Sequence, residues 1–453
     1  MRKLFGTDGI RGEANVFPLN PQGVVAIGAA AATHFRREHH RPTVVVGRDT
    51  RISGHMLSAA ISAGLCSQGA DVVDVGVVTT PAVAYITTLL GADAGVVISA
   101  SHNPFADNGI KFFGPDGYKL PDEVELDIEA SIEGFLRGAD DLPRVDGRDV
   151  GAIGLDESLQ ERYLAHLLED VGGGVDLSGM TLVVDAAHGA AYRLAPTLLK
   201  RLGARIVTLG VDPDGRNINQ GLGAVHPQVT ATRVVSQGAD LGITLDGDAD
   251  RLIMCDEHGS VVDGDHIMAM AAGYLKDRNR LNHHTVVATV MSNMGMEIAL
   301  RNMGITMERV AVGDRYVMER MREGGFNLGG EQSGHLMFTD YATTGDGLLS
   351  ALFVLKMLAD SGQTLSELAS VMKPLPQTLK NLKVGRRTPI EELPEVMAVI
   401  EEVNRRLGDT GRTLVRYSGT ENKARVMIEG PDQAAIEAMA DRIVAALARA
   451  LPL

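Results

Sequence analysis

The chain has 453 residues, of which 45% are hydrophobic and 22% charged, and its formal net charge is −15. This length predicts roughly two to four domains, and the acidic balance argues against nucleic acid or an anionic membrane as the main partner. The start lacks a signal-peptide pattern, and no apolar run approaches the roughly 20 residues of a membrane span. Cys66 and Cys255 lie in apolar stretches. We therefore expect a cytoplasmic protein with unpaired thiols.

An internal repeat organises the first two thirds of the chain. Gln68–Val77 resembles Leu202–Val211, and Gly91–Ser99 resembles Gly238–Asp246. Both copies alternate apolar, β-rich runs with Ala-rich helical stretches, which is typical of α/β units with mixed, largely parallel sheets. A fainter third copy runs over residues 302–331. The repeat predicts similar α/β domains whose functional loops follow the carboxyl ends of equivalent strands and line one shared cleft.

Changes in composition indicate the domain boundaries. The polar stretch Gly138–Gly151 separates the first unit from the second, and the Pro-rich segment Met372–Gln377 is interpreted as a hinge. The remaining C-terminal part predicts a smaller α+β domain that ends in a helix over 432–450. The expected domains are residues 1–150, 151–252, 253–370 and 377–453.

The loop Ser99–Pro104 directly follows the apolar run Ala94–Ile98. Pro104 is expected in the first turn of a helix, where free backbone N–H groups would face an anion. Ser101 then suits a phosphate carried on its oxygen, although an ordinary helix cap is the alternative on this loop alone. By contrast, Gly47–Gly54 is interpreted as a strand-to-helix loop whose ion pairs are mostly structural.

Three aspartates, Asp246, Asp248 and Asp250, occupy alternate positions after a predicted strand. Hard carboxylate oxygens at this density suit Mg²⁺ or a similar cation. A calcium-binding EF-hand is the rival, but Arg251 stands where that loop requires Gly, and the flanking sequence is strand-like. A solvated acidic turn is also disfavoured, because like charges this close repel one another unless a cation holds them.

Further segments combine polar side chains with glycine. Gly330–His335 offers a carboxylate, a hydroxyl and an imidazole suited to sugar, and Arg416–Asn422 has the ingredients of a phosphate cradle. Gly6–Gly12 spaces three glycines around Arg11, and Lys111 is a second candidate cation near Ser101 in sequence. Taken singly, each segment also fits an ordinary polar turn.

In this order, the segments resemble the signature of the α-D-phosphohexomutase family, over essentially the whole chain. The matching segments are Gly6–Gly12, Ile98–Pro104, Asp246–Arg251, Gly330–His335 and Arg416–Glu421. Gln332 and the run Val312–Val317 resemble the branch that acts on amino sugars. Asn422 departs from the family pattern, since many relatives carry Pro there.

The resemblance implies three similar mixed-sheet α/β domains and a smaller C-terminal α+β domain around a central cleft. It implies reversible conversion of glucosamine 6-phosphate to glucosamine 1-phosphate through the 1,6-bisphosphate, a step towards UDP-N-acetylglucosamine and cell-wall precursors. One Mg²⁺ per subunit and a glucosamine or glucose 1,6-bisphosphate activator are the expected cofactors. The expected partner is a small phosphosugar, with no nucleic acid and no membrane. A homodimer is one expected assembly.

The resemblance also implies residue roles. Ser101 is the phosphorylated serine, and a phosphate oxygen on it holds Mg²⁺ together with Asp246, Asp248 and Asp250. The cations expected to stabilise the transferring group or assist proton transfer are Arg11, Lys111 and Arg251. The residues expected to grip the sugar are Glu331, Ser333 and His335, and those expected to hold the non-reacting phosphate are Arg416, Ser418, Gly419 and Thr420.

The alternative functions are those of a family member acting on mannose or glucose phosphates, a non-catalytic phosphosugar-binding protein, and a Mg²⁺-dependent phosphatase.

Overall fold

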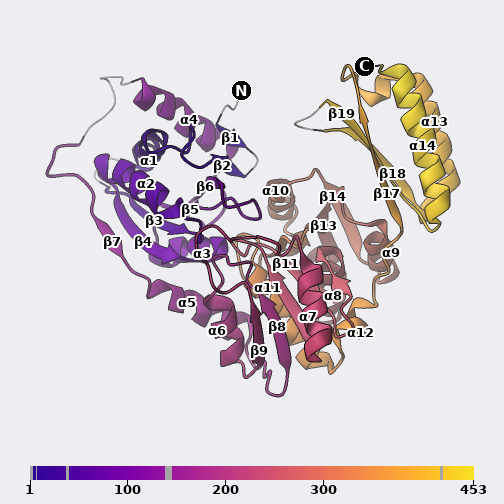
Figure 1. Cartoon of the computed structure of the whole chain (residues 1–453), viewed down its shortest axis with the longest axis horizontal. Coiled ribbons are helices and arrows are strands. Elements are labelled where there is room, and N and C mark those ends of the chain that lie inside the picture. The colour runs from indigo at the N-terminus through magenta and orange to yellow at the C-terminus, as the bar shows by residue number, and fades with distance from the viewer. Residues whose placement is uncertain (1–3, 7, 37–39, 138–144, 419–421, 453) are drawn as a thin grey trace. The chain divides into compact units, whose positions relative to one another are not determined.

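The computed structural model describes residues 4–6, 8–36, 40–137, 145–418 and 422–452 (Figure 1). The chain divides into two compact units, one of residues 1–291 with 305–371 and one of residues 292–304 with 372–453. In the described part, the first unit contains sheets of seven, five and four strands, and the second contains one sheet of three strands. Among these residues, no helix is both long and apolar enough to span a bilayer.

The first sheet contains the N-terminal strands. Its strands are β1 (Phe5–Gly6), β2 (Gly9–Glu13), β3 (Thr43–Arg48), β4 (Asp71–Val77), β5 (Ala94–Ile98), β6 (Asp107–Phe113) and β7 (Ile153–Leu155), and its helices are α1 (Pro21–Phe35), α2 (Gly54–Ser67), α3 (Thr80–Leu90) and α4 (Asp122–Leu136). The order is β1-β2-β6-β5-β3-β4-β7. Side chains alternate across the sheet, so Val44 and Val46 join one core with α1, α2 and α4. The opposite face packs on α3, where a Cβ on Gly47 would lie 2.5 Å from the Val83 side chain.

The second and third sheets follow in the same unit. Their strands are β8 (Thr181–Asp185), β9 (Arg205–Leu209), β10 (Leu241–Leu245), β11 (Leu252–Cys255), β12 (Val261–Val262), β13 (Thr285–Thr289), β14 (Thr306–Val310), β15 (Leu328–Gly330) and β16 (Leu336–Phe338). Their α-helices are α5 (Leu159–His166), α6 (Leu194–Arg201), α7 (Pro227–Gln237), α8 (Gly264–Asp277), α10 (Asp314–Gly324), α11 (Gly347–Ser361) and α12 (Leu365–Ala369). The orders are β12-β11-β10-β8-β9 and β14-β13-β15-β16.

The three sheets share one topology. The segments β6-β5-β3-β4, β11-β10-β8-β9 and β16-β15-β13-β14 have the same order, with three parallel strands and one antiparallel return strand. In each segment, a hairpin loop joins the parallel strand beside the return strand (β5, β10 or β15) to that return strand. The last paired residues before the loop are Ile98↔Ile110, Leu245↔Leu252 and Gly330↔Leu336. The structure therefore confirms the repeat, including its faint third copy.

One local prediction is wrong, because no helix begins at Pro104. Residues 101–106 form turns, and the chain then enters β6, which runs antiparallel to β5. The Asp107 amide donates to the Pro104 carbonyl (3.1 Å) and closes the last turn before the strand. Proline and small polar residues favour tight turns and helix starts alike, and here the pairing of Ile98 with Ile110 decides between them.

The second unit is a small α+β domain, as predicted. Its elements are α9 (Met294–Asn302), β17 (Gln377–Lys383), α13 (Pro394–Leu407), β18 (Arg412–Tyr417), β19 (Lys423–Glu429) and α14 (Gln433–Ala450). The antiparallel sheet has the order β17-β19-β18 and shares a hydrophobic core with α13 and α14. Helix α9 comes from the middle of the chain, and the buried Glu429 side chain accepts from the Met294 amide (3.1 Å).

A buried carboxyl group makes the stability of the first unit depend on pH. Asp346 caps the N-terminus of α11 and accepts a hydrogen bond from the Tyr163 hydroxyl (2.7 Å). Burial raises the pKa of Asp346 from 3.8 to about 6, although hydrogen bonds from Leu349 and Tyr163 favour the charged form. The folded protein therefore binds this proton more tightly than the unfolded chain does.

We expect the contribution of Asp346 to stability to be lost as the pH rises from about 4 to about 6. A raised carboxyl pKa lowers the free energy of unfolding across this window by about 3 kcal/mol. Asp346→Asn keeps a capping acceptor and should remove this part of the pH dependence. The measurement is the urea midpoint by circular dichroism from pH 4 to 7. The matched control is Asp432→Asn at the exposed N-cap of α14, and equal slopes in the two variants would contradict the prediction.

Candidate active site

Ser101 lies buried in the hairpin loop after β5, in a left-handed backbone conformation with φ +50°. Few residues other than glycine adopt this conformation, and it persists only where surrounding contacts enforce it. The Ser101 hydroxyl donates to Asp246 Oδ2 (2.5 Å), and its oxygen lies 3.3 Å from His102 Nδ1. The loop after β10 packs closely here, since a Cβ on Gly247 would lie 2.4 Å from the Ser101 carbonyl oxygen. Two hairpin loops of different repeats thus meet at one hydroxyl.

The three predicted aspartates form a buried cluster. One ligand atom from each of Asp246, Asp248 and Asp250 lies within 4.8 Å of the others. Burial, followed by the charges of Asp250 and Asp248, raises the pKa of Asp246 well above its ordinary value. Burial also acts to raise the pKa of Asp250, but the charges of Lys111, His335 and Arg251 together outweigh it, and the pKa of Asp250 falls below its ordinary value. The ionised form of Asp246 is therefore disfavoured in the buried cluster, whereas that of Asp250 is favoured.

The structure places Lys111 in the aspartate cluster. Its Nζ lies 2.9 Å from Asp248 Oδ2, 3.2 Å from Asp250 Oδ2 and 3.1 Å from Asp8 Oδ2. Burial alone would lower the pKa of Lys111, but the charges of Asp248, Asp8 and Asp250 raise it well above its ordinary value. Arg11 forms an ion pair with the same Asp8. Both predicted cations stay charged at neutral pH, and Asp8 links them.

The cluster fits a hard divalent metal ion. Among the described residues, Asp248 Oδ1 and Asp250 Oδ1 are buried and accept no hydrogen bond. Buried carboxylate oxygens without a partner are costly, and a cation bound by three carboxylates would satisfy them. The strands β10 and β11 on either side of the loop are those of a hairpin and not of an EF-hand, as the sequence indicated.

One cavity of about 390 Å³ joins the three hairpin loops within the first unit. It is lined by Leu4, Gly6, Asp8, Gly9, Arg11, Ser101, His102, Asp250, Arg251, Val312, Gly313, Asp314, Glu331 and His335. Glu331 accepts hydrogen bonds from the Gly313 amide (3.1 Å) and the exposed Ser333 hydroxyl (3.3 Å). His335 is buried beside Asp314, with 3.6 Å between Nδ1 and Oδ2. Ser101 and Glu331 therefore face the same space.

Two side chains next to Ser101 differ in charge at neutral pH. Burial, then the charges of Arg251 and Arg11, lowers the pKa of His102 to about 4. Its imidazole is therefore neutral near pH 7. Arg251 extends beside the aspartates, with its Nε 3.9 Å from Asp250 Oδ1, and its backbone pairs with that of His335. The Asp246 loop and the Glu331 loop are joined through this bridge.

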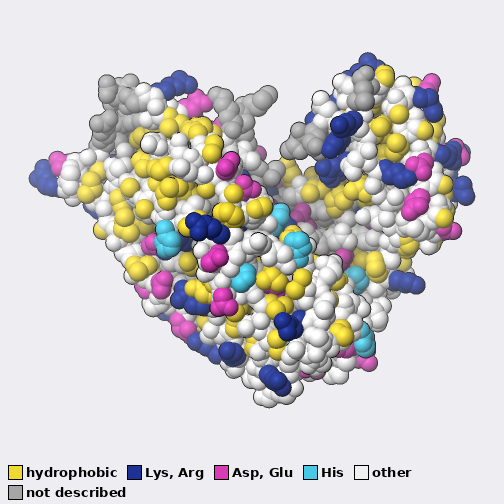
Figure 2. Space-filling view, viewed as in Figure 1, with side chains coloured by type: hydrophobic (Ala, Val, Ile, Leu, Met, Phe, Trp, Pro, Cys, Tyr) yellow, Lys and Arg dark blue, Asp and Glu magenta, His cyan; other side chains and the backbone are white. Residues whose placement is uncertain are grey.

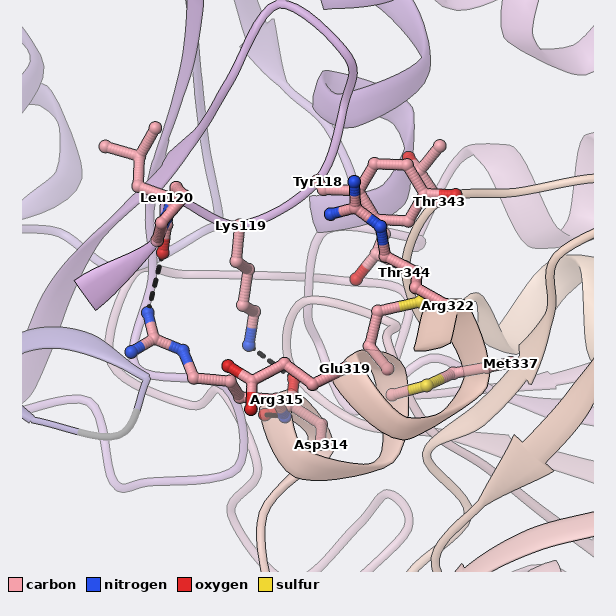
Figure 3. Close-up of a pocket in the computed structure, with 12 residues that line it drawn as sticks. Tyr118, Lys119, Leu120, Asp314, Arg315, Glu319, Arg322, Met337, Thr343 and Thr344 are labelled. Atoms are coloured by element: carbon pink, nitrogen blue, oxygen red, sulfur yellow. Dashed lines mark hydrogen bonds and ion pairs between the residues drawn. The ribbon is translucent and has the colours of Figure 1, made fainter. Parts of the chain in front are cut away.

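A second cavity, of about 200 Å³, lies next to the first and shares Asp314 with it. Figure 3 shows Lys119 pointing to Asp314 at the start of α10, and Arg315 pointing to the Leu120 carbonyl, to which it donates (2.8 Å). Lys119 also forms an ion pair with Asp8. These contacts fasten α10 of the third repeat to the loop after β6, and so fix one wall of the site.

The predicted phosphate loop belongs to the second unit. Arg416 on β18 stands opposite Arg425 on β19, and Arg425 donates to the buried Ser418 hydroxyl (3.5 Å). Burial, then the Arg425 charge, lowers the pKa of Arg416. Two facing arginines beside a hydroxyl suit an anion. Gly419 and Thr420 lie outside the described residues. Figure 2 shows Lys and Arg side chains among hydrophobic ones on the visible face of this unit.

Four residues outside the predicted set complete these contacts. Asp8 lies inside the glycine-rich motif, three residues before the predicted Arg11, and Arg425 follows the phosphate motif on the next strand. Arg51 lies in the loop whose ion pairs the sequence predicts to be mostly structural, and it donates to the backbone of the Ser101 loop. Asn219, which also contacts this loop (2.8 Å), lies in an irregular segment with no motif around it. In the sequence, Asp8 and Arg425 could have been found by their position in or next to a predicted motif.

Family profiles match nearly the whole chain in four consecutive parts. All are described as Phosphoglucomutase/phosphomannomutase: alpha/beta/alpha domain I matches residues 2–135, domain II residues 161–259, domain III residues 263–375 and the C-terminal domain residues 379–446. The chain belongs to this family of hexose phosphate mutases, in agreement with the resemblance seen in the sequence.

The chain is also similar to two curated relatives and to one solved structure. The chain is 52% identical over 450 residues to the phosphoglucosamine mutase of Myxococcus xanthus, covering 99% of this chain and 98% of the relative. It is 52% identical over 444 residues to the phosphoglucosamine mutase of Geobacter metallireducens, covering 98% of each. A crystal structure of a phosphoglucomutase/phosphomannomutase family protein from Burkholderia thailandensis superposes with a TM-score of 0.81 at 25% identity and covers all of both chains.

Proposed function

We propose that the protein is a phosphoglucosamine mutase, which interconverts glucosamine 6-phosphate and glucosamine 1-phosphate. The observation that carries this proposal is the position of the Ser101 hydroxyl. It lies 2.5 Å from Asp246, one of three buried aspartates, and Ser101 lines a cavity of about 390 Å³. A protein that only bound phosphosugars would need neither a serine in a strained conformation nor three buried carboxylates. The family and the names of the relatives at 52% identity support the same reaction.

In the proposed reaction, phosphorylated Ser101 gives its phosphoryl group to O1 of glucosamine 6-phosphate. The P–O bond to Ser101 Oγ breaks, a P–O bond to the sugar oxygen forms, and the serine oxygen gains the proton that the sugar hydroxyl loses. The glucosamine 1,6-bisphosphate then turns over and returns its 6-phosphoryl group to Ser101, so the enzyme ends as it began. A hexose 1,6-bisphosphate would act as the activator by phosphorylating Ser101 at the outset.

Asp246, Asp248 and Asp250 would hold Mg²⁺, together with an oxygen of the Ser101 phosphate. Bound there, the ion would neutralise the charge of the transferring phosphoryl group. Lys111 holds Asp248 and Asp250 in place through its ion pairs (2.9 and 3.2 Å). Arg11 and Arg251 would add positive charge around the phosphate. These positions are consistent with a reaction that depends on positioning and charge more than on covalent catalysis.

Glu331, Ser333 and His335 would recognise sugar hydroxyls shared by both orientations of the bisphosphate. The Gly313 amide and the Ser333 hydroxyl both donate to the Glu331 carboxylate, which orients it. In the second unit, Arg416, Ser418, Gly419 and Thr420 would hold the phosphate that is not reacting. Cys66 and Cys255 are free thiols, which fits our proposal of a cytoplasmic enzyme.

Arg416→Ala is expected to raise KM for glucosamine 6-phosphate by about 10–100-fold and to change kcat much less. The lost contact is a charged hydrogen bond to a phosphate away from the reacting oxygen, and such bonds contribute about 1.5–3 kcal/mol. Steady-state kinetics check this. Arg442→Ala is the matched control, because Arg442 is an exposed arginine of the same unit that pairs with Glu402. An unchanged KM in Arg416→Ala would contradict the assignment.

A single-turnover experiment tests the proposed function. The enzyme is labelled on Ser101 with radioactive phosphate and mixed with unlabelled glucosamine 6-phosphate and Mg²⁺. We expect the label to move to O1 of a sugar bisphosphate and then to remain in glucosamine 1-phosphate, while unlabelled phosphate returns to Ser101. A phosphatase would release the label as inorganic phosphate, and a pure binding protein would not take up the label. Faster transfer to mannose or glucose phosphates would favour the other branch of the family.

A further inference from the structure

Arg51 is a buried arginine whose whole guanidinium group is used. Its Nε donates to Asp49 Oδ2 (2.8 Å), and both side chains are 0% exposed. The remaining donors reach the hairpin loop that carries Ser101, far along the chain. They contact the carbonyl oxygens of Ser101 (3.0 Å), Asn103 (2.9 Å) and Asp107 (3.0 Å), and also that of Pro104. One side chain therefore satisfies four carbonyls of a loop that makes few backbone hydrogen bonds of its own.

Asp49, the ion-pair partner of Arg51, holds the other backbone polar group of Ser101, its N–H, through Ser99. Asp49 accepts from the Ser99 hydroxyl (2.7 Å), and the Ser99 oxygen in turn accepts from the Ser101 amide (2.9 Å). The N–H and C=O groups of Ser101 are thus both held, one through Ser99 and Asp49 and the other by Arg51. All of these side chains are buried.

The second repeat contributes two more hydrogen bonds, both from Asn219. Asn219, in the segment between β9 and α7, donates through its amide nitrogen to the carbonyl oxygens of Ser101 (2.8 Å) and Asn103 (3.0 Å). Arg51 and Asn219 therefore converge on the same Ser101 carbonyl from two different domains of the first unit. This convergence accounts for a non-glycine residue kept at φ +50°.

We propose that Arg51 is a positioning residue for phosphoryl transfer, which acts with Asn219 and the Asp49–Ser99 pair to lock Ser101 in the conformation that aims Oγ at Asp246. The inference rests on the proposed function, because it concerns the serine that carries the phosphoryl group there. Arg51 touches neither substrate nor metal in this account. A displacement of about 1 Å in a reacting group can lower the rate by about 100-fold. Loss of these contacts is therefore expected to lower kcat.

The first test compares Arg51→Lys with Arg48→Lys. Arg48 lies on the same segment and forms an ion pair with Asp74 (2.9 Å), away from the Ser101 loop. Lysine keeps the charge but loses the planar fork that serves several acceptors. We expect kcat of Arg51→Lys to fall by about 10–100-fold with KM changed by less than about threefold, and Arg48→Lys to keep kcat. A folded Arg51→Lys with normal kcat would overturn the proposal.

A second readout does not require turnover. Hydrogen exchange of the amides at 99–107 should be faster in Arg51→Lys than in wild type and Arg48→Lys, while exchange in α14 stays the same. If the wild-type protein isomerises no sugar phosphate, the proposed function is refuted. The hydrogen-exchange data would then still show whether Arg51 holds the Ser101 loop in place. If Arg51→Lys does not fold, Ser99→Ala and Asn219→Ala decide it: lower kcat and faster loop exchange in both support the proposal, and wild-type values overturn it.

Discussion

Replacing Ser101 with alanine is expected to lower kcat by at least about 1,000-fold, because the variant lacks the oxygen that we propose carries the phosphoryl group. The fold should be kept, since the Ser101 backbone contacts to Ser99, Arg51 and Asn219 do not involve the hydroxyl. The measurements are steady-state turnover and intact mass after incubation with glucose 1,6-bisphosphate. Wild type should gain the mass of one phosphoryl group, and Ser101→Ala should gain none.

The matched control for this variant is Ser67→Ala on α2, where the hydroxyl donates only to the Gly64 carbonyl (2.7 Å) within the helix. It should keep both turnover and phosphorylation. Phosphorylation of Ser101→Ala at another residue, with turnover retained, would show that Ser101 is not the group that transfers phosphate.

Asp246→Asn is expected to have the second largest effect, a loss of at least about 100-fold in kcat at saturating Mg²⁺. One of three charged metal ligands is lost, and metal binding to the Ser101 phosphate is correspondingly weaker. Asp246 is also the carboxylate nearest to the serine, with 2.5 Å between Oδ2 and Oγ. Kinetics with increasing Mg²⁺ measure both the affinity and the residual rate.

The stability of the same variant should change in a way that depends on the metal. Burial and the neighbouring carboxylates make the Asp246 charge unfavourable, so in chelator the melting temperature of Asp246→Asn should equal or exceed that of wild type. Added Mg²⁺ should raise the melting temperature of wild type by mass action and that of the variant much less. Asp256→Asn, at a buried carboxylate that caps the turn after β11, is the control. An equal response to Mg²⁺ in wild type and Asp246→Asn would contradict the metal assignment.

The sequence predicted the parts of the site that sit on the repeat. Ser101, Asp246 and Glu331 all follow a strand that occupies the same place in its sheet. Comparison of the copies therefore placed them together before any distance was known. The same reasoning predicted mixed sheets and a separate C-terminal α+β domain, because strand and helix periodicity persist over long, apolar segments.

Other features depend on contacts between segments that are distant in the sequence. Arg51 and Asp49 look like a local ion pair, and only the fold shows that Arg51 reaches Ser101 and Asn103. Lys111 is a candidate cation by its nearness to Ser101 in sequence, and only the fold shows that it pairs with Asp248 and Asp250. The helix predicted at Pro104 is wrong because the chain enters β6, which pairs with β5. Turn-forming residues alone do not show which segments pair as strands.

The most direct test of the central claim is phosphorus NMR of the phosphorylated protein with glucosamine 6-phosphate, Mg²⁺ and a trace of hexose 1,6-bisphosphate. We expect a growing glucosamine 1-phosphate signal with total sugar phosphate conserved, at a rate well above those for glucose and mannose phosphates. Isomerisation of glucose or mannose phosphates without glucosamine 1-phosphate would contradict the assigned substrate. Inorganic phosphate without any isomerised sugar, or no reaction at all, would contradict the mutase itself.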